Sequence, residues 1–348
     1  MGRGMGVSPV RPPAGRQGWG TGGTGDEAMK GSTVRLVAVV IGLGAIAGLA
    51  IWRFWPGPAE DANGDQRPGP SASRPSKKAA ADLAAARKAQ EDGLALYNAG
   101  EMIEARRKLS EAFFSGHLTH EQENKIIPVM TELADKTLLS GNFYSGDPYV
   151  FRQMIERGDT LSSLAKKWEL RVPWRFLAKI NNLDSTAVIR EGASITMVQG
   201  PFHAIVRKSR FLMDVYLHRE KMPKIFIKRF GVGIGNETSP TPNGLWEVTP
   251  GGKQEKTPWY PPGSGLIRRT KIQWGEPGYP LGKKGYWIPL TGRDPENRNI
   301  PGIGMHGTND PTSVGKAVSL GCLRLLDEDM EWAFAMLYDK WSTVLVLP

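Results

Sequence analysis

A single cysteine, Cys322, limits what this chain of 348 residues can fold into more than any other feature of its sequence. With one thiol, the chain forms no internal disulfide and no zinc site built from several cysteines. Each domain must therefore be stabilised by its own apolar core, for which the chain is long enough. A lone thiol is either a small buried hydrophobic group or a reactive one, and its neighbours decide between the two.

The N-terminal region contains an apolar run without charge, Leu36–Trp52. Its length is close to the minimum that crosses a bilayer, roughly 17 residues. Basic residues precede the run and an acidic cluster (Glu60, Asp61 and Asp65) follows it. The positive-inside rule then predicts a single-pass protein of the cytoplasmic membrane, with its N-terminus inside and the rest in the periplasm or cell wall. A signal peptide cleaved near Ala45-Ile46-Ala47 is the alternative, and it exports the same part of the chain.

Changes in composition divide the N-terminal half of the chain. They predict a disordered cytoplasmic tail over 1–28, a transmembrane anchor over 29–55 and a Pro/Gly/Ser-rich linker over 56–80. Residues 81–143 show helical periodicity, and part of this segment resembles a tetratricopeptide repeat. Such a short all-α segment is either a binding site for a protein partner or a spacer.

Residues 148–198 read as a short strand, two helices and a closing strand. They contain Gly158-Asp159-Thr160-Leu161, Asn181-Asn182-Leu183 and Ile189-x-x-Gly192. By these motifs the segment resembles a LysM domain, a small α+β module of β-α-α-β order that binds glycans containing N-acetylglucosamine. The candidate glycan-binding residues are Gly158, Asp159, Thr160, Asn181 and Asn182. For each of them, a purely structural role in a turn or a helix cap is at least as well supported by the sequence as glycan binding.

The C-terminal part, 202–348, is predicted to be mainly β, with apolar segments separated by turn signals. Gly231, Gly233 and Gly235 do not form a phosphate-binding loop, because no Lys-Ser/Thr pair and no helix follow them. The Gly/Pro/Trp-rich stretch 250–300 offers loops that could wall a groove.

One short segment combines residues suited to acyl transfer: Gly304-Met305-His306-Gly307-Thr308-Asn309, followed by Ser319-Leu320-Gly321-Cys322-Leu323-Arg324. A thiol has a pKa of about 8.5, so a nearby imidazole such as His306 is needed to take its proton at neutral pH. Gly321 allows backbone N–H groups to approach a developing oxyanion. Arg324 can bind a carboxylate with two hydrogen bonds.

This pattern, with Pro240-Thr241-Pro242-x-Gly244 and Pro280-Leu281-Gly282, resembles the L,D-transpeptidase (YkuD) family over essentially all of 202–348. The resemblance implies a β-sandwich-like catalytic domain in which Cys322 is the nucleophile and His306 the general base and acid. It also implies that the Gly307 carbonyl orients His306, and that the N–H groups of Gly321 and Cys322 form the oxyanion hole. Ser319, Arg324 and Thr308 would bind substrate or support the loop. The chain has Leu320 where many members have His, which removes one supporting hydrogen bond.

The predicted fold class is therefore multidomain: a transmembrane helix, a short all-α segment, a LysM domain and a mainly-β transpeptidase domain. The predicted function is peptidoglycan L,D-transpeptidation without metal or cofactor, with stem peptides and glycan strands as partners. An L,D-carboxypeptidase that uses the same site and a non-catalytic wall-binding protein are the alternatives. The formal net charge of +10 is scattered along the chain without a nucleic-acid motif, so no nucleic-acid partner is expected.

Overall fold

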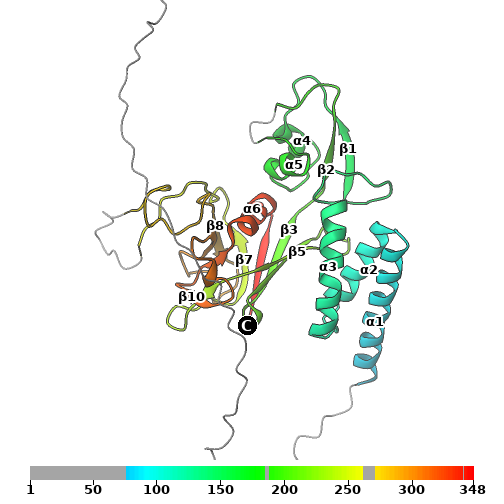
Figure 1. The fold of residues 1–348 in the computed structure, drawn as a ribbon, viewed down its shortest axis with the longest axis horizontal. Coiled ribbons are helices and arrows are strands. Elements are labelled where there is room, and N and C mark those ends of the chain that lie inside the picture. Colours follow the sequence, from blue (N-terminus) through cyan, green and yellow to red (C-terminus); the bar gives the residue numbers. More distant parts are fainter. Residues whose placement is uncertain (1–75, 185–187, 262–270, 340) are drawn as a thin grey trace, which may run out of the picture. The chain divides into compact units, whose positions relative to one another are not determined.

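The computed structural model describes residues 76–184, 188–261, 271–339 and 341–348. In chain order these residues form three helices, a small unit of two strands and two helices, and a mainly-β domain (Figure 1). The predicted tail over 1–28, the anchor over 29–55 and the linker as far as residue 75 lie outside the described residues.

The predicted transmembrane helix and single-pass membrane localisation require correction. No helix within the described ranges is both long enough and apolar enough to cross a bilayer. The longest helices within these ranges are α1 (Lys77–Asn98) and α3 (His120–Thr137), and charged side chains recur along both. Such charges are expensive at the centre of a bilayer. The apolar run Leu36–Trp52, on which the prediction depended, is not part of the described structure.

The helical segment consists of α1, α2 (Met102–Phe114) and α3. Helix α1 begins within the last residues of the predicted linker, because Ser76 accepts a hydrogen bond from the Ala79 amide (3.2 Å) and an Ala-rich sequence follows. The close packing of α1 on α2 requires a glycine at position 93, where a Cβ atom would approach the Leu109 side chain to 2.7 Å.

The next unit has the predicted β-α-α-β order. Strands β1 (Val150–Met154) and β2 (Ser194–Val198) pair antiparallel, and helices α4 (Leu161–Lys167) and α5 (Trp174–Ile180) lie between them in the chain. The inward side chains of this unit belong to the same apolar core as the mainly-β domain.

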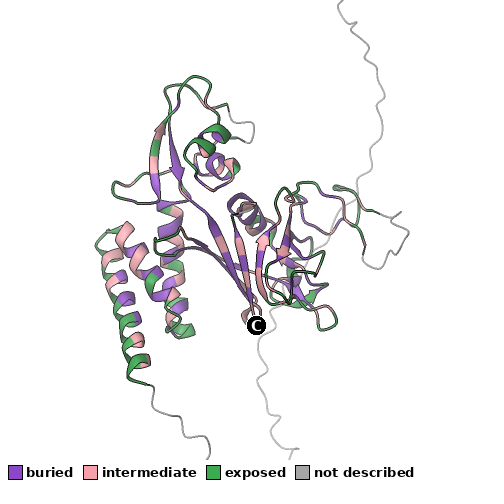
Figure 2. Ribbon diagram, turned by 180° about the vertical axis from the view of Figure 1, so that it is seen from behind, coloured by how far each residue is buried: buried purple, intermediate pink, exposed green. Residues whose placement is uncertain are grey.

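An eight-stranded mixed sheet dominates the remainder, in the spatial order β11-β9-β8-β7-β12-β3-β4-β5. Its strands are β3 (Phe202–Arg207), β4 (Leu212–Leu217), β5 (Ile225–Gly231), β7 (Gly244–Val248), β8 (Trp287–Gly292), β9 (Gly304–Gly307), β11 (Leu323–Leu325) and β12 (Thr343–Leu347). A second, parallel pair joins β6 (Ile234–Gly235) to β10 (Ala317–Ser319), and helix α6 (Asp327–Met336) follows β11. The central strands are largely buried (Figure 2). This mainly-β architecture agrees with the prediction.

The sheet curls until its two ends approach each other. The residue pair Gly233 and Arg324 exchanges two backbone hydrogen bonds, of 2.8 and 2.9 Å. Gly233 follows the edge strand β5, whereas Arg324 belongs to the opposite edge strand β11. The strand that follows the lone cysteine is therefore paired on both sides, with β9 on one and with Gly233 on the other.

The helical segment packs against β5. The Phe226 amide donates to the Ser110 hydroxyl (3.1 Å), and the ring of Phe226 contacts that of Phe113 with centroids 5.3 Å apart. An ion pair joins Glu123 of α3 to Arg210 (2.6 Å). This packing covers an edge strand that would otherwise offer unpaired backbone groups to other chains.

The LysM-like unit contacts the mainly-β domain through polar and aromatic groups. Lys179 of α5 pairs with Glu331 of α6 (2.7 Å), and the Phe176 ring meets Phe202 edge-on with centroids 4.9 Å apart. The Arg171 guanidinium also lies 4.2 Å from the centroid of the Trp341 ring. The two units thus share an interface as well as a connecting chain.

Candidate active site

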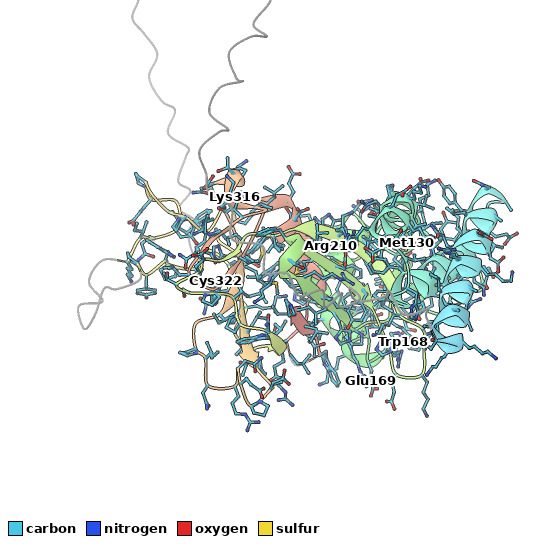
Figure 3. All side chains as sticks on the ribbon, turned by 90° about the horizontal axis from the view of Figure 1, so that it is seen from below. Met130, Trp168, Glu169, Arg210, Lys316 and Cys322 are labelled. Carbon is cyan, nitrogen blue, oxygen red and sulfur yellow. The ribbon has the colours of Figure 1, made fainter. Side chains whose placement is uncertain are left out.

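Two adjoining strands bring Cys322 and His306 to one groove. Strands β9 and β11 run parallel with Arg324 opposite His306, and Cys322 immediately precedes β11. Both Cys322 and His306 line a groove of about 800 Å³. Figure 3 shows the Cys322 side chain among the yellow to orange strands and loops of the C-terminal domain. The structure therefore brings together the two residues that the sequence singled out.

The imidazole of His306 is held in one tautomer. Its Nδ1 lies 2.7 Å from the carbonyl oxygen of Gly307. Because a carbonyl oxygen only accepts, Nδ1 must carry the proton, which leaves Nε2 as the basic nitrogen. The Trp287 ring on β8 stacks on the imidazole, with centroids 5.9 Å apart and planes inclined by 26°. Gly307 must be small, since a Cβ atom there would lie 2.5 Å from Oδ1 of Asp327.

The loop that carries Cys322 is tightly bent. Gly321 has φ +106°, and a Cβ atom there would lie 2.9 Å from the side chain of Ile303. The Cys322 thiol lies 3.4 Å from the Gly302 carbonyl. The buried Ser319 hydroxyl donates to the Cys322 carbonyl (2.6 Å) and accepts from the Gly321 amide (3.2 Å). In this structure the Gly321 N–H is thus bound within the loop.

Loops of the predicted groove-wall region line the site. The groove residues that come from this region are Gln254, Thr257, Pro258, Trp259, Tyr260, Gly278, Tyr279, Pro280, Leu281 and Trp287. Tyr260 and Leu320 are both exposed, so the groove has an apolar rim. A concave groove with mostly apolar walls and a few polar groups is typical of a ligand-binding site.

Burial favours the neutral forms of both Cys322 and His306. Desolvation lowers the pKa of His306 to about 4; the hydrogen bond to Gly307 opposes this shift, and the positive charge of Arg324 adds to it. Desolvation also raises the pKa of the Cys322 thiol, against a backbone hydrogen bond with Gly304 and the charge of Arg324. At neutral pH the pair is therefore a thiol beside a neutral imidazole rather than a preformed ion pair.

Comparison with known proteins identifies this arrangement. A family model described as L,D-transpeptidase catalytic domain (YkuD) matches residues 201–346, and a LysM domain model matches residues 154–197. YkuD of Bacillus licheniformis, whose name assigns it to the L,D-transpeptidases, is 43% identical over 183 residues, or 51% of this chain and 87% of the relative. The chain belongs to the L,D-transpeptidase (YkuD) family.

Two further L,D-transpeptidases illustrate the range of similarity. YkuD of Bacillus subtilis is 27% identical over 183 residues, again 51% of this chain and 87% of the relative. A solved structure of an L,D-transpeptidase from Mycobacterium smegmatis has a TM-score of 0.33 and 14% identity, and the match covers 47% of this chain and 79% of that one. The family models and the Bacillus licheniformis relative show that this chain is an enzyme of the L,D-transpeptidase class with a LysM domain before the catalytic domain.

The three residues predicted to bind substrate or support the loop all line the groove, but the hydroxyl groups of two of them have partners within the protein. Arg324 and Thr308 line the groove, although the Thr308 hydroxyl is already bonded to the Asp310 backbone (3.2 Å to O and 3.1 Å from N). Ser319 also lines the groove, but its hydroxyl bonds hold the cysteine loop together. Arg324 is the one of the three that offers a charged group to a ligand.

In the LysM domain, the candidate glycan-binding residues have internal partners. The Asn181 side chain binds the backbone of Leu177 and Thr196 in three hydrogen bonds of 2.8 Å and so joins α5 to β2. Thr160 caps α4, and Asp159 accepts from the Glu156 amide (2.9 Å). Gly158 and Asn182 have positive φ angles of 87° and 53°. Their role in glycan binding stays a prediction.

Sequence reasoning missed residues that shape the transpeptidase site from a distance along the chain. Trp287 stacks on His306, and Asp327 accepts from the Lys283 amide (3.0 Å) while its carboxylate packs against Gly307. The tryptophan-rich composition of 250–300 was a signal for Trp287, but it could not say which ring meets the histidine.

The buried histidines predict acid sensitivity of the fold. Desolvation lowers the pKa of His203 to about 4, with further lowering by His218 and Lys224 and an opposing backbone hydrogen bond with His218. Desolvation likewise lowers the pKa of His306 to about 4. In the unfolded chain both titrate near 6.5, so the unfolded state binds more protons between pH 6.5 and 4. The free energy of unfolding should therefore decrease as the pH is lowered from 6.5 to 4, by up to about 1.4 kcal/mol per pH unit for each histidine.

Urea unfolding of the whole chain at pH 7.5, 6, 5 and 4.5 measures this slope. His203→Asn, whose amide oxygen can accept from the Thr343 amide as Nδ1 does (3.1 Å), should make the slope shallower. His120→Gln is the matched control, because its side chain is 75% exposed. An equal slope in all three proteins would contradict the assignment.

Proposed function

We propose that this L,D-transpeptidase acts on peptidoglycan through a thioester on Cys322. The support comes from the fixed His306 tautomer: with Nδ1–H bound to Gly307, Nε2 is the nitrogen that can take the thiol proton in the groove that both residues line. Since thiol and imidazole are both neutral at rest, proton transfer accompanies the attack.

In the first half-reaction Cys322 Sγ attacks the carbonyl carbon of the L-centre before the terminal D-residue of a tetrapeptide stem. His306 Nε2 takes the thiol proton, and the oxyanion forms beside the backbone N–H groups around Cys322. Collapse of the tetrahedral intermediate breaks the C–N bond, and the imidazolium returns its proton to the leaving amine. A D-amino acid and a thioester result.

In the second half-reaction an acceptor amine attacks the thioester carbonyl. His306 Nε2 takes the proton of that amine, the C–S bond breaks, and the proton returns to the sulfur. The product is a new amide, either a cross-link between stems or an attached protein. Arg324 suits the stem carboxylates, since a guanidinium binds them with two hydrogen bonds.

The LysM domain and the transpeptidase domain together favour peptidoglycan as the polymer that the chain binds. A glycan-binding module on the same chain raises the local concentration of stems at the catalytic groove, and this requires no conformational change. The cell wall is accordingly the proposed place of action.

Mass spectrometry of muropeptides tests the proposal. The whole chain and its Cys322→Ala variant are incubated with disaccharide-tetrapeptides. We expect cross-linked dimers and free D-amino acid from the wild type alone. Tripeptides without dimers would show that water, and not an amine, attacks the thioester, and the enzyme would then be an L,D-carboxypeptidase. Dimers from the Cys322→Ala variant would overturn the role of the thiol.

A further inference from the structure

A buried threonine outside the groove is bonded to the loop that carries Cys322. The Thr241 hydroxyl donates to the carbonyl of Gly321 (2.9 Å) and accepts from the amide of Gly235 (2.8 Å). Thr241 is 2% exposed, and it is not among the described residues that line the groove. Thr241 therefore reaches the site only through the backbone.

The surrounding structure fixes Thr241 from both sides. Gly235 pairs with Ser319 in the parallel β6–β10 ladder, next to the cysteine loop. A Cβ atom on Gly235 would lie 2.5 Å from the Thr241 amide nitrogen, so only glycine permits this approach. The Lys208 ammonium also donates to the Thr241 carbonyl (3.0 Å). A hydroxyl held this firmly can fix the direction of the group it bonds.

The bonded group belongs to the same peptide unit as the Cys322 N–H. In a planar trans peptide, the C=O of one residue and the N–H of the next point in opposite directions. Holding the Gly321 carbonyl toward Thr241 thus turns the Cys322 N–H away from Thr241. The Ser319 hydroxyl holds the following carbonyl, that of Cys322 itself (2.6 Å). Both peptide planes that flank the nucleophile are then fixed by hydroxyl groups.

We propose that Thr241 is a positioning residue for acyl transfer, which sets the orientation of the Cys322 N–H as an oxyanion donor. The inference rests on the proposed function of Cys322. The Gly321 N–H already donates to Ser319 in this structure. Stabilisation of the oxyanion therefore depends more on the Cys322 N–H and on the direction in which it points. A donor fixed before the reaction costs no reorganisation when the negative charge develops.

This role separates two reactions of one thiol. Acyl transfer forms an oxyanion and needs the N–H in place. Alkylation by iodoacetamide displaces iodide at a saturated carbon, forms no oxyanion, and depends only on the thiol and its base. Loss of the Thr241 hydroxyl should therefore slow acyl transfer without slowing alkylation.

The experiment uses the whole chain with Thr241→Val, which keeps the side-chain shape, Thr241→Ala as a second variant should Val not fold, and Thr241→Ser. Thr238→Val is the matched control, since Thr238 lies in the same turn, is exposed, and bonds only Asn236 among the contacts described for its hydroxyl (3.0 Å). Each variant is first checked for a cooperative thermal transition. Turnover of disaccharide-tetrapeptide and iodoacetamide alkylation of Cys322 are then measured on the same samples.

We expect Thr241→Val to lower kcat at least about 10-fold, because one misplaced oxyanion donor costs up to 100–1,000-fold. KM and the alkylation rate should change less than about 2-fold, and Thr241→Ser should recover most of the turnover. Wild-type kcat in Thr241→Val, or an equal fall of alkylation and turnover, would overturn the inference alone. Turnover by Cys322→Ala, or none by the wild type, would overturn the proposed function and this inference with it.

Discussion

Replacement of His306 by asparagine is expected to lower kcat for tetrapeptide turnover by about 100- to 10,000-fold, the usual contribution of a general acid-base group. Asparagine has no nitrogen that takes a proton at neutral pH, so the thiol must ionise unaided. Its ionisation is unfavourable because burial raises the pKa of Cys322. Unlike Thr241→Val, this change should slow iodoacetamide alkylation as well.

Steady-state turnover and its pH dependence measure the effect. Since burial lowers the pKa of His306 to about 4, the wild-type enzyme should keep its base down to that pH, and kcat/KM should decline near pH 4 rather than near 6.5. His120→Asn is the control, as an exposed histidine away from the groove. If the decline of kcat/KM at acid pH were unchanged in His306→Asn, that decline would reflect the titration of another group.

The largest effect on stability is expected at a buried ion pair in the helical segment. The Arg106 guanidinium donates to both carboxylate oxygens of Asp147 (2.9 and 3.0 Å) and to the Thr137 hydroxyl (2.7 Å). The side chains of the pair are 1% and 0% exposed. Arg106→Met leaves a carboxylate buried without its partner, and this should lower the free energy of unfolding by about 3–5 kcal/mol.

Urea unfolding tests this expectation. Arg106→Met combined with Asp147→Leu should lose less than the single variant, because no unpaired charge remains buried. Lys88→Met is the control: it breaks the exposed Lys88–Asp92 pair (2.9 Å) and should change stability by less than about 0.5 kcal/mol. A loss below about 1 kcal/mol in Arg106→Met would show that the pair contributes little.

The parts of the site that are close in sequence could be predicted from it. His306 and Cys322 stand in short glycine-rich segments whose residue types already suggest acyl transfer, and strand pairing then brings them together. The mainly-β domain and the β-α-α-β order could also be predicted, because the alternation of apolar and polar residues and the turn signals are local features of the sequence.

The remaining contacts depend on tertiary packing and left no local signal. Thr241 and Gly321 meet only because β6 pairs with β10, and the covering of β5 by α2 and α3 depends on Phe226 fitting beside Phe113. The hydropathy pattern, in contrast, led to a prediction that required correction, that of a transmembrane helix. The apolar run Leu36–Trp52 has the composition of a membrane span, but the described helices that follow it carry too many charges to cross a bilayer.

The position of β12 has a consequence for how the enzyme is made. This strand, Thr343–Leu347, lies between β7 and β3 in the eight-stranded order and pairs with both. Val344 pairs with Ala204, so the ribosome synthesises one partner long before the other. A nascent chain can contain Cys322 and His306 before the strand between β7 and β3 has been made. The pairings of β12 with β3 and β7 therefore form only after the segment that contains His306 and Cys322 has been synthesised.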